Sequence, residues 1–217
     1  MTQVESGLSP ALPKIFQIGF NRCGTRSLHE LMVANGIDAV HWKEGAIART
    51  MAANVAAGRE PLHAIDGHTA YFDMEWVTPD TVIEARCYFR ELATAYPDAL
   101  FILNMRDVEG WLLSRLRHGK GSYAAAFAGA SGIRDKENLF ALWRTQWDQH
   151  HAAVKTFFQK RPGRLLCFDV EKDDPQIIAD FLAPHYRIDA SLYPHLHRTK
   201  SDNDAELAAR RAFGHTE

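Results

Sequence analysis

The sequence is poor in cysteine and has neither a marked excess of one charge nor a long apolar run. Its three cysteines, Cys23, Cys87 and Cys167, lie far apart and fit neither a disulfide framework nor a zinc site, so we expect a reducing, cytoplasmic location. The formal net charge of -2 argues against a nucleic-acid binder. No window approaches the roughly 18 to 20 apolar residues of a membrane span, and residues 1–13 do not resemble a signal peptide. These absences predict a soluble globular protein without a membrane span.

The length of 217 residues suits a single domain with a full hydrophobic core. We expect a flexible N-terminal tail at 1–13, the folded domain at 14–200, and a charged tail or surface helix at 201–217. The chain shows no internal repeat.

Short apolar runs alternate with helical patterns along the chain. Strands are predicted at 15–19, 39–42, 63–65, 100–105 and 165–170. Helices are predicted at 28–36, 78–97 and 139–158, the second of them capped by Thr78-Pro79. This alternation indicates an α/β fold in three layers, with a central, mainly parallel sheet flanked by helices.

Two segments carry finer predictions. The stretch 119–132 is rich in glycine and alanine and lacks periodicity, so a mobile loop is expected there. In the helix at 139–158, Trp143 and Trp147 are expected in the core, and the rings of His150 and His151 are expected to point one inward and one outward.

The segment from Lys14 to Leu28 runs from an apolar strand through a glycine-bounded turn into a helix. Gly19 and Gly24 stand in the G-x-x-x-x-G frame of a P-loop, whose backbone N–H groups surround phosphate oxygens. Thr25 and Arg26 replace the lysine and the magnesium-binding hydroxyl of a nucleotide hydrolase. A permanent cation, Arg22, lies inside the loop instead, which indicates an anion cradle. The alternative is a tight turn with a solvated arginine.

A second constellation follows the apolar strand at 100–105. Arg106 ends this strand, Asp107 is a suitable helix N-cap, and Ser114 lies two turns into the helix, where its hydroxyl could share an anion with Arg106. By itself this spacing also fits a strand-end charge and an unrelated surface serine.

Together the two motifs resemble those of the sulfotransferases that use 3′-phosphoadenosine 5′-phosphosulfate (PAPS), a family with a P-loop-like fold. The family's phosphosulfate loop, G-x-x-[RK]-[ST]-G-T-[TR]-x-L, is matched by 19–28 with Cys23 as the departure. Its 3′-phosphate motif, an arginine followed eight residues later by serine, is matched by Arg106 and Ser114. Further likeness at 88–107 and 165–182 extends the resemblance over most of the chain.

The resemblance implies roles for these residues. Arg22 would stabilise charge on the transferring sulfuryl group, and Arg106 and Ser114 would bind the 3′-phosphate. The 5′-phosphate and the sulfate would be held by the Thr25 hydroxyl and by the backbone amides of Cys23, Gly24, Thr25, Arg26 and Ser27. A late basic loop could return Arg198 or Lys200 to the nucleotide. No metal ion is expected, and a metal site from His195 and His197 lacks partners at ligand spacing.

The acceptor needs a general base. His41 is the first candidate because it follows the first helix and a weak strand, near the place where related enzymes carry a catalytic glutamate or histidine. Glu44 and Asp73 are the alternatives, and each of the three could instead have only a structural role.

The sequence therefore predicts a PAPS-dependent sulfotransferase that acts on a hydroxyl or amine of a small molecule or glycan. The rivals are a P-loop kinase or other nucleotide-binding protein, and a catalytically inactive binding protein on the same fold. The acceptor and the oligomeric state stay open.

Overall fold

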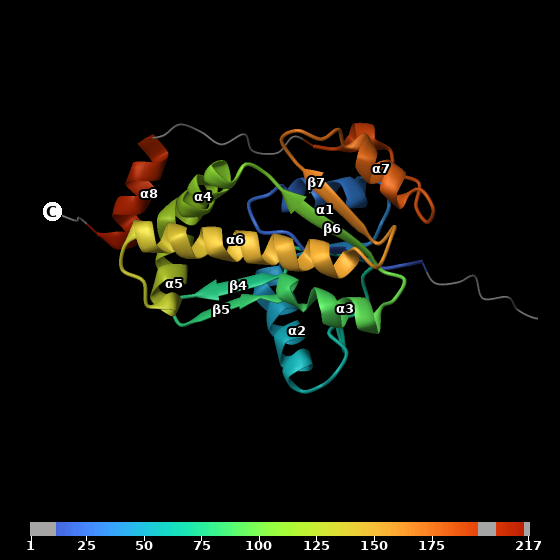
Figure 1. The fold of residues 1–217 in the computed structure, drawn as a ribbon, viewed down its shortest axis with the longest axis horizontal. Helices are drawn as coiled ribbons and strands as arrows, with labels where there is room; N and C mark the ends of the chain where they lie inside the picture. Colours follow the sequence, from blue (N-terminus) through green and yellow to red (C-terminus); the bar gives the residue numbers. More distant parts are fainter. Residues whose placement is uncertain (1–11, 195–202, 215–217) are drawn as a thin grey trace, which may run out of the picture.

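The computed structural model describes residues 12–194 and 203–214. At its centre lies a sheet of five parallel strands in the order β2-β3-β1-β6-β7 (Figure 1). The strands are β1 (Ile15–Gln17), β2 (Ala39–His41), β3 (Ala70–Phe72), β6 (Leu100–Met105) and β7 (Leu165–Asp169). The predicted α/β class with a parallel central sheet is confirmed.

Helices surround this sheet. They are α1 (Thr25–Ala34), α2 (Ala46–Ala56), α3 (Phe89–Ala95), α4 (Val108–Arg117), α5 (Ser122–Ser131), α6 (Lys136–Phe158), α7 (Gln176–Leu182) and α8 (Asn203–Phe213). Short 3₁₀ turns are η1 (Lys43–Gly45), η2 (Ala85–Tyr88), η3 (His118–Gly121) and η4 (Ala190–Leu192). No helix within the described ranges combines the length and the apolar composition needed to cross a membrane.

The three layers follow from the two-residue period of the strands. Ile15 and Ile102 pack with α1 and α7 on one face of the sheet, whereas Phe16 and Leu103 pack with α2, α3 and α6 on the other. In Figure 1, α6 runs across this second face. Because both faces are covered, the strands are apolar almost throughout.

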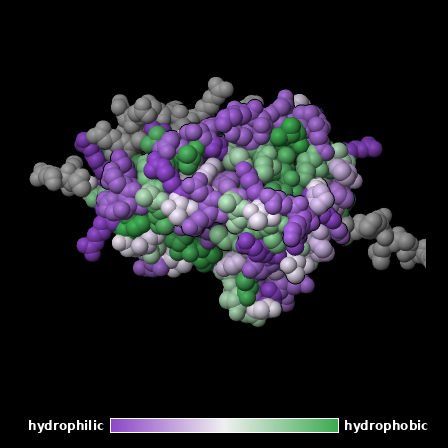
Figure 2. Space-filling view, in the orientation of Figure 1, coloured by the Kyte–Doolittle hydropathy of each residue, from purple (hydrophilic) through white to green (hydrophobic). Residues whose placement is uncertain are grey.

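A third apolar cluster continues from the turn after β1. Phe20 packs against Trp111 with ring centroids 4.8 Å apart, and Trp143 is fully buried beside them. The cluster joins α4, α5 and α6, and α8 completes it with the buried Ala208. In the space-filling view hydrophobic residues also gather over α5 and the neighbouring hairpin (Figure 2).

The predicted strands at 15–19, 39–42, 100–105 and 165–170 are confirmed, but the strand at 63–65 is wrong. Its backbone forms successive turns, in which His63 N–H donates to Glu60 at 3.0 Å and Ile65 N–H donates to Leu62 at 2.8 Å. Leu62 is buried in the core, so apolar burial here does not require a strand. The strand in this part of the chain is β3.

The predicted helix at 78–97 is also wrong in its first half. Residues 75–84 form an antiparallel hairpin of β4 (Glu75–Thr78) and β5 (Thr81–Glu84), with Val77 opposite Val82. Pro79 begins the tight turn between the strands rather than a helix. The cross-strand pairing of β-branched and aromatic side chains outweighs the helical spacing, and the helix begins only at Phe89.

The expected loop at 119–132 is instead the helix α5, bounded by Gly121 and Gly132 with φ of 94° and 67°. Its alanines favour a helix. The sequence did not predict one because apolar residues occur on every side of the helix and leave no amphipathic pattern. The helix at 139–158 is confirmed within α6.

Both histidines of α6 are buried, so the prediction of one outward ring is wrong. His150 Nε2 lies 2.6 Å from the carbonyl oxygen of Ile18, and His151 Nδ1 lies 2.7 Å from that of Trp147. Each bond satisfies one nitrogen of a ring inside the core, while Nε2 of His151 is buried without a hydrogen-bond partner in the described part of the chain. Trp143 and Trp147 pack in the third cluster, as predicted.

Candidate active site

The glycine-bounded loop connects β1 with α1, and its shape depends on two left-handed residues. Gly24, which precedes α1, has φ of 73°, and Arg22 has φ of 62°. A non-glycine residue in this region is strained, and such strain is commonly found at functional sites. Gly19 is required for a different reason, because a Cβ there would lie 2.1 Å from the carbonyl oxygen of Asn104.

Two buried amides on neighbouring strands hold the loop. The Asn104 side chain, on β6, donates to the carbonyl oxygens of Phe20 at 3.3 Å and Cys23 at 2.7 Å, and accepts from Gly19 N–H at 3.1 Å. Gln17 Nε2, on β1, donates to Asn104 Oδ1 at 2.6 Å. These groups satisfy one another inside the sheet.

Gln17 also extends this arrangement to the third strand. Its Oε1 accepts a hydrogen bond of 2.8 Å from the backbone N–H of Asp73, which follows β3 and has φ of 53°. One pair of amides therefore positions both the loop and Asp73. We did not predict this role, although a polar residue inside each of two apolar strands was a visible signal.

Cys23, the departure from the family motif, belongs to the third apolar cluster. Its side chain is fully buried, and burial raises the pKa of its thiol. The side chain therefore serves the core, and only the backbone of this position is available to an anion.

Arg22, Ser114 and Arg106 meet beside the loop. Arg22 Nε donates to Ser114 Oγ at 3.2 Å, and Arg106 Nη1 donates to the carbonyl oxygen of Arg22 at 3.4 Å. Asp107 caps α4, since its side chain accepts from Gly110 N–H at 2.8 Å. Burial lowers the pKa of Arg22, Asp73 raises it, and Arg106 lowers it again. The loop thus faces two close cations, an arrangement suited to an anion of more than one charge.

His41, Thr25 and Asp73 form a second group at the same edge of the sheet. Thr25 Oγ1 lies 3.2 Å from His41 Nε2, which lies 3.6 Å from Asp73 Oδ2. Burial, followed by His29 and Arg26, lowers the pKa of His41 to about 4. Burial and then Glu75 raise the pKa of Asp73 to about 7, against the opposing effects of Arg22 and Arg115. His41 is therefore neutral at neutral pH, whereas Asp73 is close to its midpoint.

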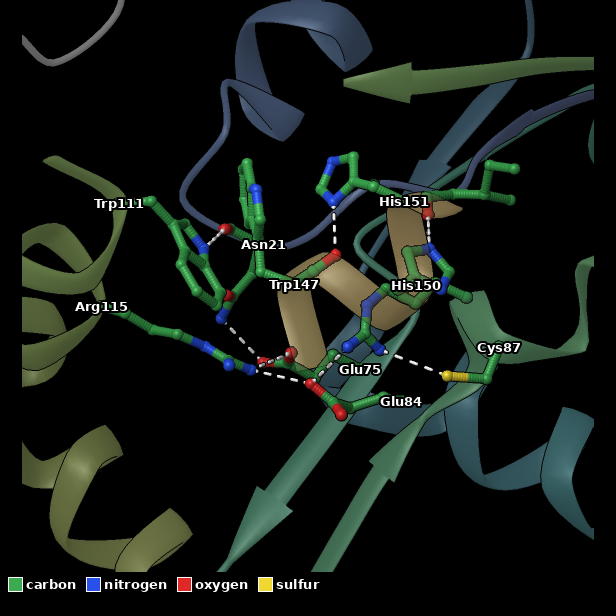
Figure 3. A network of polar contacts seen from close by, with 12 residues as sticks. Asn21, Glu75, Glu84, Cys87, Trp111, Arg115, Trp147, His150 and His151 are labelled. Carbon is green, nitrogen blue, oxygen red and sulfur yellow. Dashed lines mark hydrogen bonds and ion pairs between the residues drawn. The ribbon is translucent and has the colours of Figure 1, made fainter. Parts of the chain in front are cut away.

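After burial, the second cause of the raised pKa of Asp73 is Glu75, which belongs to a buried charged network that we call the Arg115 network (Figure 3). Arg115 Nη2 donates to Glu75 Oε2 at 3.2 Å and to Glu84 Oε1 at 2.8 Å. Asn21, from the loop, donates to Glu75 Oε1 at 2.7 Å. Glu75 thus lies between the loop and the core, two residues from Asp73.

The remaining residues predicted from the sequence are not part of these two groups. Glu44 is exposed in η1, where its carbonyl oxygen accepts from Arg49, so the structure groups Asp73 and not Glu44 with His41. Arg26 is exposed and pairs with Glu30, whereas Ser27 is buried in the first turn of α1. Arg198 and Lys200 lie outside the described residues. Among the described residues, no group of three or more histidine, cysteine, aspartate or glutamate side chains could hold a metal ion.

A comparison with known protein families assigns the chain to one of them. A family model described as a sulfotransferase domain matches residues 14–127, which is more than half of the chain. The match contains the loop, His41, Asp73, Arg106 and Ser114. No curated protein matches the chain. By the family match, the chain belongs to the sulfotransferase domain family.

Proposed function

We propose that the protein transfers a sulfuryl group from PAPS to a hydroxyl or amine of a small molecule or glycan. The observation that carries this proposal is the convergence of Arg22, Ser114 and Arg106 beside a glycine-bounded loop. An adenylate with a single phosphate chain needs the loop alone, whereas a donor with a separate 3′-phosphate needs a second anion site. The presence of two anion sites side by side therefore supports PAPS over ATP as the nucleotide.

In this proposal the loop amides of 23–27 and the Thr25 hydroxyl hold the 5′-phosphate and the sulfate. Arg22 faces the bridging oxygen, where charge develops as the bond to sulfur breaks. Arg106 and Ser114 hold the 3′-phosphate. Because two arginines neutralise the donor, the scheme needs no magnesium ion.

The transfer step then requires alignment and removal of one proton. A bond forms between the acceptor oxygen and sulfur while the bond between sulfur and the 5′-phosphate oxygen breaks, and 3′,5′-phosphoadenosine leaves with the electron pair. The acceptor proton passes to a base at the edge formed by β2 and β3.

Both His41 and Asp73 are candidates for this base, and we propose Asp73. A general base is most effective when its pKa lies near the working pH. Burial and Glu75 raise the pKa of Asp73 to about 7, whereas burial lowers the pKa of His41 to about 4. His41 then orients the Thr25 hydroxyl toward the sulfate.

Isothermal titration calorimetry tests the nucleotide. We expect 3′,5′-phosphoadenosine to bind at least about tenfold more tightly than ATP with magnesium, because only the former matches both anion sites. The reverse order would favour a kinase or a nucleotide hydrolase. Transfer of radiolabelled sulfate from PAPS to a panel of phenols, sugars and amines then separates an enzyme from an inactive binding protein.

The variant Arg106→Ala tests the 3′-phosphate site. We expect it to weaken binding of 3′,5′-phosphoadenosine by about 10- to 100-fold, since a charged hydrogen bond is lost, while adenosine 5′-phosphate binds as before. Arg161→Ala is a matched control, because the guanidinium carbon of Arg161 lies 3.8 Å from the centroid of the Phe157 ring, away from the loop. An unchanged preference for the 3′-phosphate in Arg106→Ala would contradict the assignment.

A further inference from the structure

The arginine proposed to bind the 3′-phosphate already holds a carboxylate of the chain itself. Glu171 Oε1 forms an ion pair with Arg106 Nη2, and Glu171 Oε2 accepts a hydrogen bond of 3.0 Å from the backbone N–H of Asp107. A guanidinium and a backbone amide therefore bind two oxygens of one anion. Two oxygens of a phosphate would use the same donors.

Glu171 can leave these donors without a change of fold. Its side chain is 37% exposed, while that of Arg106 is 16% exposed, so the carboxylate lies on the solvent side of the guanidinium. The backbone N–H of Glu171 donates to Asp169 Oδ1 at 3.0 Å, which fixes the turn after β7 independently of the glutamate side chain. Rotation of that side chain alone uncovers Arg106.

A carboxylate and a phosphate cannot share Arg106 at low cost. Among the described residues, Nη1 of this guanidinium donates to the carbonyl oxygen of Arg22 and Nε is buried without a hydrogen-bond partner. The Arg22 side chain is already directed to Ser114. With Glu171 in place, a 3′-phosphate would bring a second anion to one cation. Occupation by one anion therefore opposes occupation by the other.

We infer that Glu171 competes with the 3′-phosphate of the donor for Arg106 and the Asp107 amide, and so reduces the preference for nucleotides that carry a 3′-phosphate over those that do not. This inference rests on the proposed function. A nucleotide with a 3′-phosphate binds only to the fraction of molecules in which Glu171 is displaced. A partly exposed ion pair should reduce the apparent affinity for such a nucleotide by up to about fivefold. A nucleotide without a 3′-phosphate leaves Glu171 where it is.

The test is calorimetric titration of wild type, Glu171→Gln and Glu171→Ala with 3′,5′-phosphoadenosine and with adenosine 5′-phosphate. Both variants should bind 3′,5′-phosphoadenosine more tightly, by up to about fivefold, and adenosine 5′-phosphate with the affinity of wild type. Glu109→Gln is the matched control, because Glu109 carries the same charge on α4 but pairs with Arg144 at 2.6 Å. Its affinities should equal those of wild type, and circular dichroism establishes that each variant is folded.

The outcomes separate this inference from the function on which it rests. Wild type that binds 3′,5′-phosphoadenosine, with both Glu171 variants equal to it or weaker, overturns the competition and leaves the function standing. Tighter binding of both nucleotides also overturns it, because Glu171 would then act through general charge. Absence of 3′,5′-phosphoadenosine binding in every variant overturns the proposed function, and the inference with it.

Discussion

Replacing Asp73 with asparagine should lower kcat by a factor of about 10² to 10⁴, the usual contribution of a general base. Asparagine keeps the shape of the side chain, and the backbone N–H of residue 73 still donates to Gln17. The affinity for 3′,5′-phosphoadenosine should therefore change by less than about threefold, because no side chain proposed to hold the donor is replaced. Transfer of labelled sulfate to the best acceptor of the panel, at saturating PAPS, measures the first quantity, and calorimetry measures the second.

The pH dependence gives an independent reading of the same residue. Burial and Glu75 raise the pKa of Asp73 to about 7, and a base works only when it is deprotonated. In the wild type kcat/KM should therefore fall as the pH falls through about 7, and it should reach a plateau above that value. In Asp73→Asn the residual activity should lose this dependence.

His41 is the competing base, and His41→Ala distinguishes the two. If Asp73 is the base, His41→Ala should lower kcat only about tenfold, because the Thr25 hydroxyl is then no longer oriented by His41. If His41 were the base, the wild-type profile would stay flat down to about pH 4, the value to which burial lowers the pKa of His41. A flat profile together with the larger loss in His41→Ala would reject our assignment.

The parts of this site that the sequence revealed are local in the chain. Gly19, Arg22 and Gly24 belong to one strand, turn and helix, and Arg106 and Ser114 belong to one strand and helix. Backbone geometry couples residues at these short spacings, so the pattern predicts their arrangement. That both motifs lie at the same edge of the sheet follows from the parallel pairing of β1 with β6.

The parts that the sequence did not reveal depend on tertiary contacts. The hairpin at 75–84 was misread because the helical spacing of Val82, Ile83 and Phe89 is also consistent with a strand followed by a turn. Glu171 was not identified, since a glutamate after a strand has no pattern, and only the fold brings it to Arg106. Arg115 gave no signal either, because an arginine in a helix is usually exposed.

Arg115 carries the second large expected effect. The variant Arg115→Met should lower the free energy of unfolding by about 3 to 5 kcal/mol, the usual cost of removing one partner of a buried ion pair. Arg115 is fully buried and pairs with both Glu75 and Glu84. Arg86 Nη2, which lies 3.0 Å from Glu84 Oε1, then remains as a cation beside the two carboxylates. Methionine occupies much of the same space among the rings of Trp111 and Trp143, so the loss reports charge more than volume. Urea unfolding followed by circular dichroism measures it.

The control is the same substitution at an exposed ion pair. Arg144, on α6, pairs with Glu109 at 2.6 Å, and both side chains are exposed, so Arg144→Met should cost at most about 1 kcal/mol. Equal losses in the two variants would show that the Arg115 network adds nothing beyond a surface pair. Adding Glu75→Gln to Arg115→Met should restore part of the stability, because a neutral amide is cheaper to bury than an unpaired carboxylate.

The network should also act on the site, since Arg115 lowers the pKa of Asp73 while Glu75 raises it. Removal of the cation favours the protonated carboxyl, so in Arg115→Met the rise of kcat/KM should move to higher pH. Adding Glu75→Gln removes the carboxylate that opposes ionisation of Asp73, and the rise should then return toward lower pH. A profile that neither substitution moves would mean that the network supports the fold alone. Opposite displacements would show that the charges buried behind the loop also set the pH at which Asp73 can accept a proton.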